Sequence, residues 1–335
     1  MVTMADVAER SGVSRSTVWA VLQGKTTVRK KNRLKVLEAL RETGYQQRLV
    51  SGSLLSQFSQ VVGVLIQNSG SPFFNEVIAA LQAALQESGY SIMWHDSGGD
   101  RADEAEALER FAECQLGGLV VAPARPEAPS PRIVQFAEEG KPLVSLGPVS
   151  GVTASYVAFE DRKGTRMATD YLLSKGHRRV AHLAGPEGGA SADERILGFI
   201  EALLAAGVAF DDSMIERTYA DPYTGHEAAL KVLSQRRARP TALVCFNDLV
   251  AIAAYRAAHE LGLHVPDDVS IIGFDGIALG AYIGPPLTTV SIAPRGVGEA
   301  AAELLLPQLK GESGKRPQNR MIEAELIERA SVREV

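Results

Sequence analysis

The chain has 335 residues, of which 45% are hydrophobic and 22% are charged, and its formal net charge is −5. This length exceeds one ordinary domain, so we expect two or three compact units. The opening MVTMADVAER lacks the basic start and apolar run of a secretory signal, and no window reaches the roughly 18 to 20 apolar residues of a membrane span. We therefore expect a cytoplasmic protein without membrane attachment. With only Cys114 and Cys245, we expect buried thiols rather than a disulfide framework.

The charge is divided unevenly along the chain. Residues 1–50 contain ten Lys and Arg against four Asp and Glu, a net charge of +6, so the rest of the chain carries −11. Lys and Arg displace counterions from phosphates, and a basic head on an acidic body therefore indicates a polyanion partner. A solvated charged face would give the same count.

The first 22 residues have the pattern of two short helices joined by a turn. Thr3 and Ser14 stand where capping residues belong, and Gly12 provides the turn between the helices. The second helix has an inner apolar face made of Val18, Val21 and Leu22. This is the helix-turn-helix arrangement, in which the start of the second helix meets base edges in the major groove. A generic three-helix fragment of a larger helical domain is the alternative.

A third helix is predicted from Lys30 to Thr43, with Gly44 as its stop. Its inward face is expected to consist of Leu34, Leu37 and Leu40. Residues 46–60 are mostly polar and have weak helical tendency, so we interpret them as a linker. We refer to residues 1–45 as the head and to residues 61–335 as the body.

The body has the pattern of an α/β fold. Val61–Gln67 is an apolar strand, Phe74–Ser88 an amphipathic helix and Tyr90–Trp94 a second strand, which together form a βαβ unit. Further apolar runs separated by helical segments are Leu119–Ala122, Leu143–Leu146, Val180–Leu183, Ala242–Phe246 and Ser270–Phe274. Such runs are typical of buried parallel strands in a doubly wound sheet, which binds its ligand outside the carboxyl ends of the strands.

Several residues fall where that ligand is expected. Phe73 and Phe74 follow the first strand, where their rings could stack on a sugar or a base or could plug the core. Asn247 and Asp275 directly follow strands and could bond hydroxyl groups or cap the next helix. The guanidinium fork of Arg195 suits a carboxylate, a phosphate or vicinal hydroxyls, although a surface arginine is the simpler interpretation.

The motifs of the chain coincide, in order, with those of one family. The string Thr3-Met-Ala-Asp-Val-Ala-Glu-Arg-Ser-Gly-Val-Ser-Arg-Ser-Thr-Val18 resembles the first two helices of LacI/GalR-type regulators. Later matches are Gly63-Val-Leu-Ile66, Ser71-Pro-Phe-Phe74, Lys175-Gly-His-Arg-Arg-Val-Ala-His182, Arg195-Ile-Leu-Gly-Phe199, Phe246-Asn-Asp248, Val265-Pro-Asp-Asp-Val-Ser-Ile-Ile-Gly-Phe-Asp275 and Pro286-Leu-Thr-Thr-Val290. The chain is thereby identified, by resemblance, as a member of this family from end to end.

The resemblance implies an all-α helix-turn-helix head in residues 1–45, a hinge in residues 46–60 and a periplasmic-binding-protein-like α/β domain with two doubly wound lobes in residues 61–335. It assigns residues 61–159 and 291–321 to lobe 1, and residues 160–290 and 322–335 to lobe 2. A small-molecule effector, a sugar or sugar derivative, is expected in the cleft between the lobes. The chain would then be a homodimeric repressor on a pseudo-palindromic DNA operator.

On the DNA side, the resemblance implies contacts from Thr3, Ser14, Arg15, Ser16, Thr17, Ala20 and Lys25, and from Leu54. Of these, Arg15 and Ser16 are the expected base readers, and Leu54 is either a minor-groove wedge or an exposed linker leucine. Relatives commonly read Thr-Val-Ser-Arg-Val-Leu-Asn where this chain reads Thr17-Val-Trp-Ala-Val-Leu-Gln23. Operator preference should therefore differ, and Trp19 belongs either to the core or to the surface.

On the effector side, the expected residues are Phe73, Phe74, Glu160, Asp161, Arg195, Tyr219, Asn247 and Asp275. Arg195 matches the arginine with which the family clasps its effector. The chain has Glu160-Asp161 where the family usually has Asp-Asn, and this extra carboxylate makes a nucleoside or amine-bearing effector an alternative to a sugar. Ala220 stands where relatives often have a large aromatic residue, so Tyr219 or Tyr223 could take its place.

Two other classes of protein fit the sequence less well. A transport binding protein would need a signal peptide and no basic head. An enzyme would need a catalytic motif, and the chain has no GxxxxGK[ST] loop, no GxSxG elbow and no metal-ligand cluster. We therefore expect neither catalysis nor a cofactor, and keep as the alternative function a sensor or activator with a different class of ligand.

Overall fold

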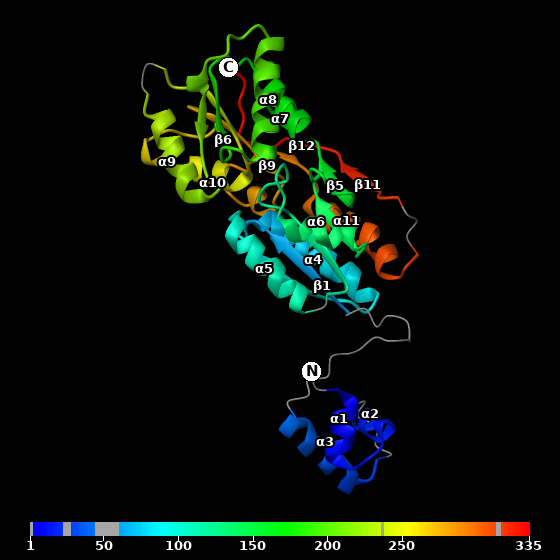
Figure 1. Ribbon diagram of the computed structural model, residues 1–335. Helices are drawn as coiled ribbons and strands as arrows, with labels where there is room; N and C mark the ends of the chain where they lie inside the picture. Colours follow the sequence, from blue (N-terminus) through cyan, green and yellow to red (C-terminus); the bar gives the residue numbers. More distant parts are fainter. Residues whose placement is uncertain (1–2, 23–27, 44–59, 115, 236–237, 313–315) are drawn as a thin grey trace. The chain divides into compact units, whose positions relative to one another are not determined.

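The computed structural model shows two compact units, Met1–Gln57 and Phe58–Val335. It describes residues 3–22, 28–43, 60–114, 116–235, 238–312 and 316–335 (Figure 1). The smaller unit contains the head and the larger unit contains the body. The predicted linker lies almost entirely outside the described residues, as do Lys25 and Leu54.

The described head consists of the helices α1 (Met4–Ser11), α2 (Arg15–Leu22) and α3 (Lys30–Thr43). Thr3 caps α1 in a capping box with Asp6, and Gly12 ends the helix in the left-handed conformation at φ 63°. The α2 turn is closed by a hydrogen bond that the Thr17 amide donates to the Ser14 hydroxyl. The buried core of the head is made of Val7, Ala8, Val18, Val21, Val36 and Ala39.

The predicted inner face of α3 is wrong in part. Leu34 and Leu37 are 59% and 51% exposed, whereas Val36 and Ala39 are buried and Leu40 packs partly against them. Both stripes have helical spacing, but small side chains at positions 36 and 39 let α3 approach α1 closely. The bulkier leucines therefore remain on the outside.

The described part of the body contains two six-stranded sheets. The first has the strand order β11-β5-β4-β3-β1-β2, and the second has the order β12-β10-β9-β8-β6-β7. Strands of the first sheet are β1 (Val61–Ile66), β2 (Ser91–Asp96), β3 (Gly118–Val121), β4 (Leu143–Leu146), β5 (Ser155–Phe159) and β11 (Asn319–Ile322). Strands of the second are β6 (Val180–Ala184), β7 (Ile215–Arg217), β8 (Ala242–Cys245), β9 (Ser270–Asp275), β10 (Thr288–Ser291) and β12 (Glu325–Ile327). All strand pairs are parallel except β10 with β12, as the continuous apolar runs predicted.

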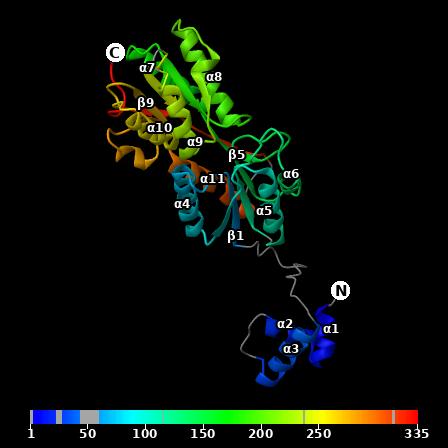
Figure 2. The same cartoon turned by 90° about the vertical axis from the view of Figure 1, so that its left-hand side faces the viewer.

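Helices cover both faces of each sheet (Figures 1 and 2). They are α4 (Pro72–Glu87), α5 (Arg101–Glu113), α6 (Pro131–Glu138), α7 (Asp161–Ser174), α8 (Ala190–Ala205), α9 (Pro222–Leu233), α10 (Asp248–Glu260) and α11 (Pro294–Leu309), with short 3₁₀ helices at Asp212–Met214 and Ala278–Ala281. The helices pack in the pairs α4 with α11, α5 with α6, α7 with α8, and α9 with α10.

The chain passes between the two sheets three times, after β5, after β10 and between β11 and β12. The largest hydrophobic cluster includes side chains from both sheets, such as Val64 of β1 and Phe274 of β9. Cys245 is buried at the end of β8, but Cys114 is exposed where it ends α5, so the expectation for that thiol is wrong. No helix among the described residues is long and apolar enough to cross a membrane.

Candidate functional site

A cavity of about 1050 Å³ lies at the carboxyl ends of the strands of both sheets. Its walls include residues that follow β1, β3 and β4 of the first sheet and β6 and β8 of the second, and the last residue of β9. All eight predicted effector residues line it: Phe73, Phe74, Glu160, Asp161, Arg195, Tyr219, Asn247 and Asp275. Phe73, Phe74, Asn247 and Asp275, which were predicted from strand ends, therefore share one cavity with the residues that the family resemblance added.

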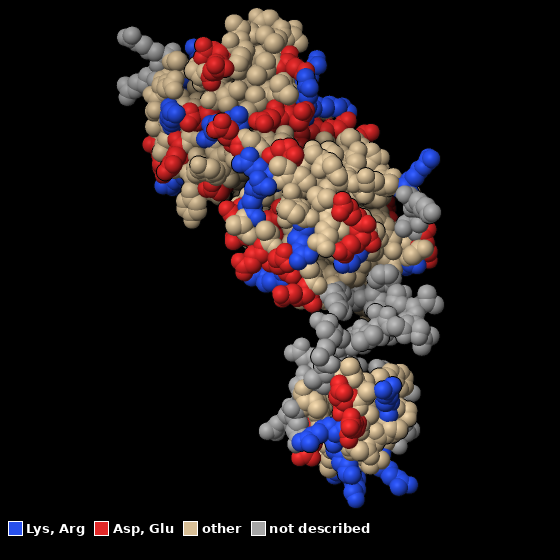
Figure 3. All heavy atoms as spheres, viewed as in Figure 1, with Lys and Arg blue, Asp and Glu red and all other residues tan. Residues whose placement is uncertain are grey.

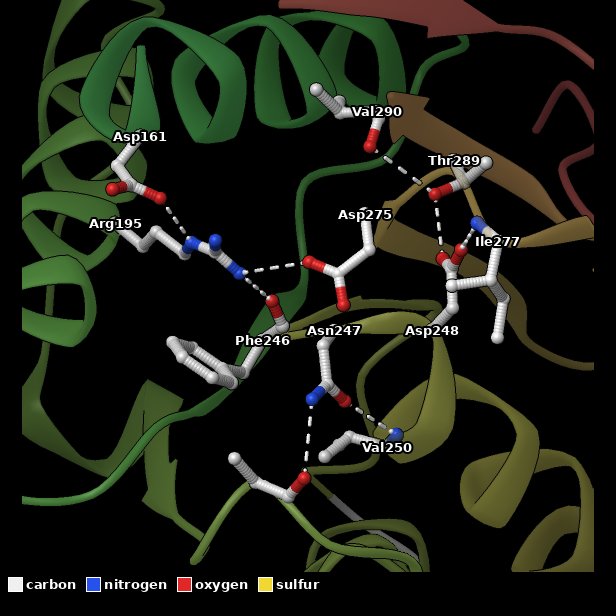
Figure 4. Close-up of polar contacts among 11 residues, drawn as sticks. Asp161, Arg195, Phe246, Asn247, Asp248, Val250, Asp275, Ile277, Thr289 and Val290 are labelled. Carbon is white, nitrogen blue, oxygen red and sulfur yellow. Dashed lines mark hydrogen bonds and ion pairs between the residues drawn. The ribbon is translucent and has the colours of Figure 1, made fainter. Parts of the chain in front are cut away.

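Arg195 is the centre of a buried charge cluster in this cavity (Figure 4). Its side chain is only 5% exposed, so the interpretation as a surface arginine is wrong. Nε donates to Oδ1 of Asp161 at 2.7 Å, and Nη1 donates to the Phe246 carbonyl oxygen and lies 3.9 Å from Oδ1 of Asp275. Cζ lies 3.6 Å from the ring centroid of Phe274 and 4.5 Å from that of Phe246. The two rings and the three oxygens hold the guanidinium in one orientation.

The contact between Arg195 and Asp161 depends on how closely α8 approaches α7. Gly198 stands on α8 where a Cβ atom would lie 2.1 Å from the carbonyl oxygen of Arg162 on α7. Any larger residue would push the helices apart. Gly198 therefore lets Arg195, one turn earlier on α8, reach the carboxylate at the start of α7.

Asp275 ends β9 and is 8% exposed. Its backbone φ is 110°, a conformation that residues other than glycine rarely adopt. Burial raises the pKa of its carboxyl well above the ordinary value, while the charge of Arg195 opposes that rise. The turn after it is held by Asp248, whose carboxylate accepts from the Ile277 amide at 2.8 Å and from the Thr289 hydroxyl at 2.6 Å. Asp248 is itself fully buried, which raises its pKa to about 7.

Asn247 caps the next helix and also lines the cavity. Its Oδ1 accepts from the Val250 amide at 2.8 Å and so caps α10, and its Nδ2 donates to the Ala220 carbonyl at 3.1 Å. The side chain also lines the cavity and is 6% exposed. An amide has two N–H donors and two acceptor lone pairs, so these two bonds leave capacity for a ligand.

Glu160 lies at the junction where the chain first leaves the first sheet. Nζ of Lys163 donates to both carboxylate oxygens at 2.9 and 3.0 Å, and Oε2 also accepts from the Ala324 amide at 3.1 Å. The hydrogen bond from Lys163 lowers the pKa of Glu160. Because Lys163 neutralises this carboxylate, Glu160 does not add the unpaired negative charge that its sequence position suggested.

The aromatic residues of the cavity differ in exposure. Phe73 is 7% exposed and packs edge-on against Phe74 and Phe159, with centroid distances of 5.3 and 6.1 Å, so it is mainly a core residue. Phe74 is half-buried and leaves part of its ring for a ligand. Tyr219 is 78% exposed at the rim of the cavity, whereas Tyr223 is 85% exposed and is not among the cavity residues.

Sequence reasoning missed the role of two phenylalanines. Phe246 supplies both a carbonyl acceptor and a ring to Arg195, and Phe274 supplies the second ring. Both occur in the motifs already singled out, one residue before Asn247 and one before Asp275. Only the fold shows that these two strand ends both lie against Arg195. Across the described residues, no group of three or more His, Cys, Asp or Glu could hold a metal ion.

The second candidate surface is the outer face of α2 in the head. Arg15 and Ser16 are exposed there, and Ala20 is half-exposed. Lys and Arg side chains are prominent on the face of the head seen in Figure 3. The hydroxyls of Ser14 and Thr17 bond each other at 2.9 Å, and the Thr3 hydroxyl donates to Asp6, so these three residues also stabilise the helix starts.

The comparisons with known proteins cover both units. The pattern of bacterial regulatory proteins of the lacI family matches residues 3–47, and that of a periplasmic binding protein-like domain matches residues 169–332. The HTH-type transcriptional repressor PurR of Vibrio vulnificus is 32% identical over 100% of both chains. PurR of Aliivibrio fischeri strain MJ11 is 32% identical over 99% of this chain and 98% of its own.

Two solved structures match the whole chain as well. The transcriptional regulator CelR in complex with cellobiose aligns with a TM-score of 0.73 at 27% identity and covers 99% of this chain and 100% of its own. The lac repressor dimer bound to operator and the anti-inducer ONPF aligns with a TM-score of 0.69 at 26% identity and covers 99% of each chain. These matches confirm the helix-turn-helix head and the two-sheet α/β fold. The chain therefore belongs to the lacI family of bacterial regulatory proteins and is a DNA-binding transcriptional regulator.

Proposed function

We propose that this chain is a homodimeric repressor whose affinity for a pseudo-palindromic operator is controlled by a small molecule bound in the cavity. Residues 1–45 bind the DNA, residues 46–60 form the hinge, and residues 61–335 bind the effector and the second subunit. The observation that carries the proposal is the buried Arg195 cluster, which faces a cavity of about 1050 Å³ in a chain with a helix-turn-helix head.

The chemistry of the cavity favours a sugar or sugar derivative. Among the described residues, no hydrogen bond reaches Nη2 of Arg195, and Asn247 and Asp275 also keep polar capacity. These donors and acceptors suit vicinal hydroxyl groups, while the half-buried ring of Phe74 suits the apolar face of a sugar ring. The structure of CelR with cellobiose shows that this fold accommodates a sugar in a relative.

A nucleoside is the second candidate, and a simple amine fits less well. The cavity volume of about 1050 Å³ slightly exceeds the range of about 300 to 1,000 Å³ that is usual for drug-sized ligands, so a nucleoside would fit. A cation, however, needs an unpaired carboxylate. Among the described residues, three of the four carboxylates of the cavity wall are paired, Asp161 and Asp275 with Arg195 and Glu160 with Lys163. The fourth, Glu194, is exposed to water.

The proposed mechanism is a shift between two arrangements of the lobes. An effector that binds one cleft geometry better than the other changes the population of each, and only this differential affinity can alter DNA binding. A tenfold change in operator affinity requires about 1.4 kcal/mol of coupling free energy. Two or three hydrogen bonds made in only one geometry, at about 0.5 to 1.5 kcal/mol each, would supply it.

The test combines operator selection with an effector screen. The full chain is used to select duplexes from a random pool, and binding of the selected duplex is then measured with sugars, glycosides, nucleosides and amines. We expect one symmetric consensus and at least one sugar that changes its affinity. Asp275→Ala should retain the consensus and lose the response, whereas the exposed Asp267→Ala should retain both. If no duplex is preferred with or without metabolites, the proposal is wrong.

A further inference from the structure

Three buried aspartates lie in one part of the body, at the start of α7, the start of α10 and the end of β9 (Figure 4). Asp161, Asp248 and Asp275 are 9%, 0% and 8% exposed. The charges of Arg195, Asp161 and Asp248 all act on Asp275, and the charge of Arg329 acts on Asp248. Three acids therefore face two bases. A buried charge without compensation is costly, so one of the three carboxyls is expected to carry a proton.

Two of the three aspartates are stabilised as carboxylates by hydrogen bonds. Asp161 accepts from Nε of Arg195 at 2.7 Å. Asp248 accepts from the Ile277 amide at 2.8 Å and from the Thr289 hydroxyl at 2.6 Å. Hydrogen bonds donated to a carboxylate favour its charged form, so these two side chains are poor candidates for the proton.

The carboxyl group of Asp275 has no such donor. Among the described residues, no hydrogen bond reaches it, and its ion pair with Nη1 of Arg195 is 3.9 Å long. That distance exceeds the range of a hydrogen bond, and Nη1 already donates to the Phe246 carbonyl oxygen. Burial raises the pKa of Asp275 well above its ordinary value, which agrees with this inventory of donors. The proton is therefore expected on Asp275.

The other charged groups of this region are compensated elsewhere. Among the described residues, the neighbouring strands β8 and β10 carry one titratable side chain, the Cys245 thiol, and burial raises its pKa so that it stays neutral. The remaining charged residues of the cavity wall are paired or exposed: Glu160 with Lys163, Arg162 with Glu201, and Glu194 in water. The charge balance at Asp275 therefore depends on Arg195 and the other two aspartates.

We propose that Asp275 carries a proton in the protein without effector and releases it when the effector binds. The O–H bond of the carboxyl breaks, the proton passes to the solvent, and hydroxyl groups of the effector donate to the two carboxylate oxygens. These new hydrogen bonds supply the stabilisation that the protein itself does not give to the anion. The inference rests on the proposed function and adds that effector affinity depends on pH.

The first test locates the proton without any effector. Asp275→Asn resembles the protonated carboxyl in shape but cannot be ionised. A carboxyl with a raised pKa binds its proton more tightly in the folded chain than in the unfolded chain, so it contributes stability at low pH that is lost as the pH rises. The urea midpoint of the wild type should therefore fall relative to that of Asp275→Asn as the pH is raised from 4 to 8.

The matched control is Asp267→Asn, which removes an exposed carboxylate. Its urea midpoint should run parallel to that of the wild type over the same range of pH. Parallel curves for the wild type and Asp275→Asn would overturn the inference. So would a wild type that gains stability relative to Asp275→Asn with rising pH, because Arg195 would then hold Asp275 in its ionised form.

The second test follows the released proton in the wild-type chain. The probe is the sugar that changes operator affinity most in the screen, titrated by calorimetry at pH 6 in buffers with different enthalpies of ionisation. The dependence of the heat on the buffer should correspond to about one proton released per site, and affinity should rise by up to about tenfold per unit of pH. Asp267→Asn should release the same amount, whereas any binding that remains in Asp275→Asn should release none.

The outcomes separate this inference from the proposed function. Sugar binding without release of a proton would overturn the inference and leave the proposed function intact. If the wild type selects no duplex, the proposed function itself is wrong, and the urea experiment still decides whether Asp275 carries the proton.

Discussion

The head and the cleft differ in the exposure of the side chains that we propose to bind DNA and effector. Arg15 and Ser16 of the head are exposed, whereas Arg195 and Asp275 of the cleft are 5% and 8% exposed. Exposed side chains gain little from folding and can be exchanged at small cost in stability. Buried charges must be compensated inside the protein, because water no longer solvates them. In the cleft, stability and function are therefore carried by the same contacts.

This difference explains where the chain departs from its relatives. In the head, Trp19 and Ala20 replace polar and charged residues without disturbing the core of Val7, Val18 and Val36. In the cleft, the departure at Glu160 is accompanied by an ion pair with Lys163 and by a bond to the Ala324 amide. The core of the head thus does not depend on residues 19 and 20, whereas the carboxylate of Glu160 is held by contacts with other residues of the body.

The largest expected effect is the loss of Arg195. Arg195→Ala should abolish the effector response and lower the free energy of unfolding by about 3 to 5 kcal/mol, because it leaves the buried Asp161 and Asp275 without their cation. Urea denaturation gives the stability, and operator binding with and without effector gives the response. If the same contacts of Arg195 carry stability and effector binding, the variant must lose both the stability and the effector response.

The control for Arg195 is an exposed ion pair on the same two helices. Arg162 of α7 is paired with Glu201 of α8 at the surface, so Arg162→Ala should leave the free energy of unfolding unchanged within error. If Arg195→Ala were as stable as this control, the cluster would be solvated. The contrast between head and cleft would then disappear.

The next largest expected effect is the pH dependence of the free energy of unfolding that comes from one buried histidine. His182 on β6 is fully buried, and its Nδ1 lies 2.9 Å from the Val244 carbonyl, to which it donates, while Nε2 has no partner among the described residues. Burial lowers its pKa from 6.5 to about 4. Below pH 6.5 the unfolded chain takes up a proton that the folded chain refuses. His182 therefore removes roughly 3 kcal/mol of stability as the pH falls from 6.5 to 4.

The variant His182→Asn keeps a donor for the Val244 carbonyl but cannot be protonated. Its stability should depend less steeply on pH between 6.5 and 4 than that of the wild type, even if its stability is lower throughout. The exposed His259→Asn on α10 is the control and should keep the wild-type slope. Equal slopes for His182→Asn and the wild type would show that His182 is accessible to protons in the folded state.

Much of the fold could be predicted because the continuous apolar runs of the sequence coincide with the buried strands of the structure. Leu143–Leu146 was predicted as a strand and is β4 with the same bounds. The inner face of α3 could not be predicted, because Leu34 and Leu37 have the same helical spacing as Val36, Ala39 and Leu40. Which of these two sets of side chains is buried depends on how α3 packs against α1. That packing cannot be derived from the sequence of α3 alone.

The candidate site was predictable as a set of positions but not as a set of contacts. Residues after strands, such as Asn247 and Asp275, share an edge of the sheet by topology alone. The partners of Arg195 come from α7, β9 and the residue after β8, so its orientation requires the packed structure. The pairing of Glu160 with Lys163 is different, since their spacing of three residues at a helix start is visible in the sequence.

The smallest effect is expected at Arg15, on the exposed side of the comparison. Arg15→Ala should weaken binding of the selected operator by about 1 to 3 kcal/mol and broaden the base preference at one position of each half-site, as for a base-reading arginine. The free energy of unfolding should not change, because Arg15 is exposed and outside the core of the head. Repeated selection from the random pool gives the preference, and urea denaturation gives the stability.

Lys35→Ala supplies the control for Arg15, since it removes a positive charge from an exposed position on α3. Removing a charge alone reduces affinity for all duplexes and leaves the base preference intact, because attraction to phosphates carries no sequence information. Arg15→Ala should therefore differ from Lys35→Ala in the consensus rather than in overall affinity. An unchanged consensus in both variants would assign Arg15 to the phosphate backbone, and Ser16 would remain as the expected base reader of α2.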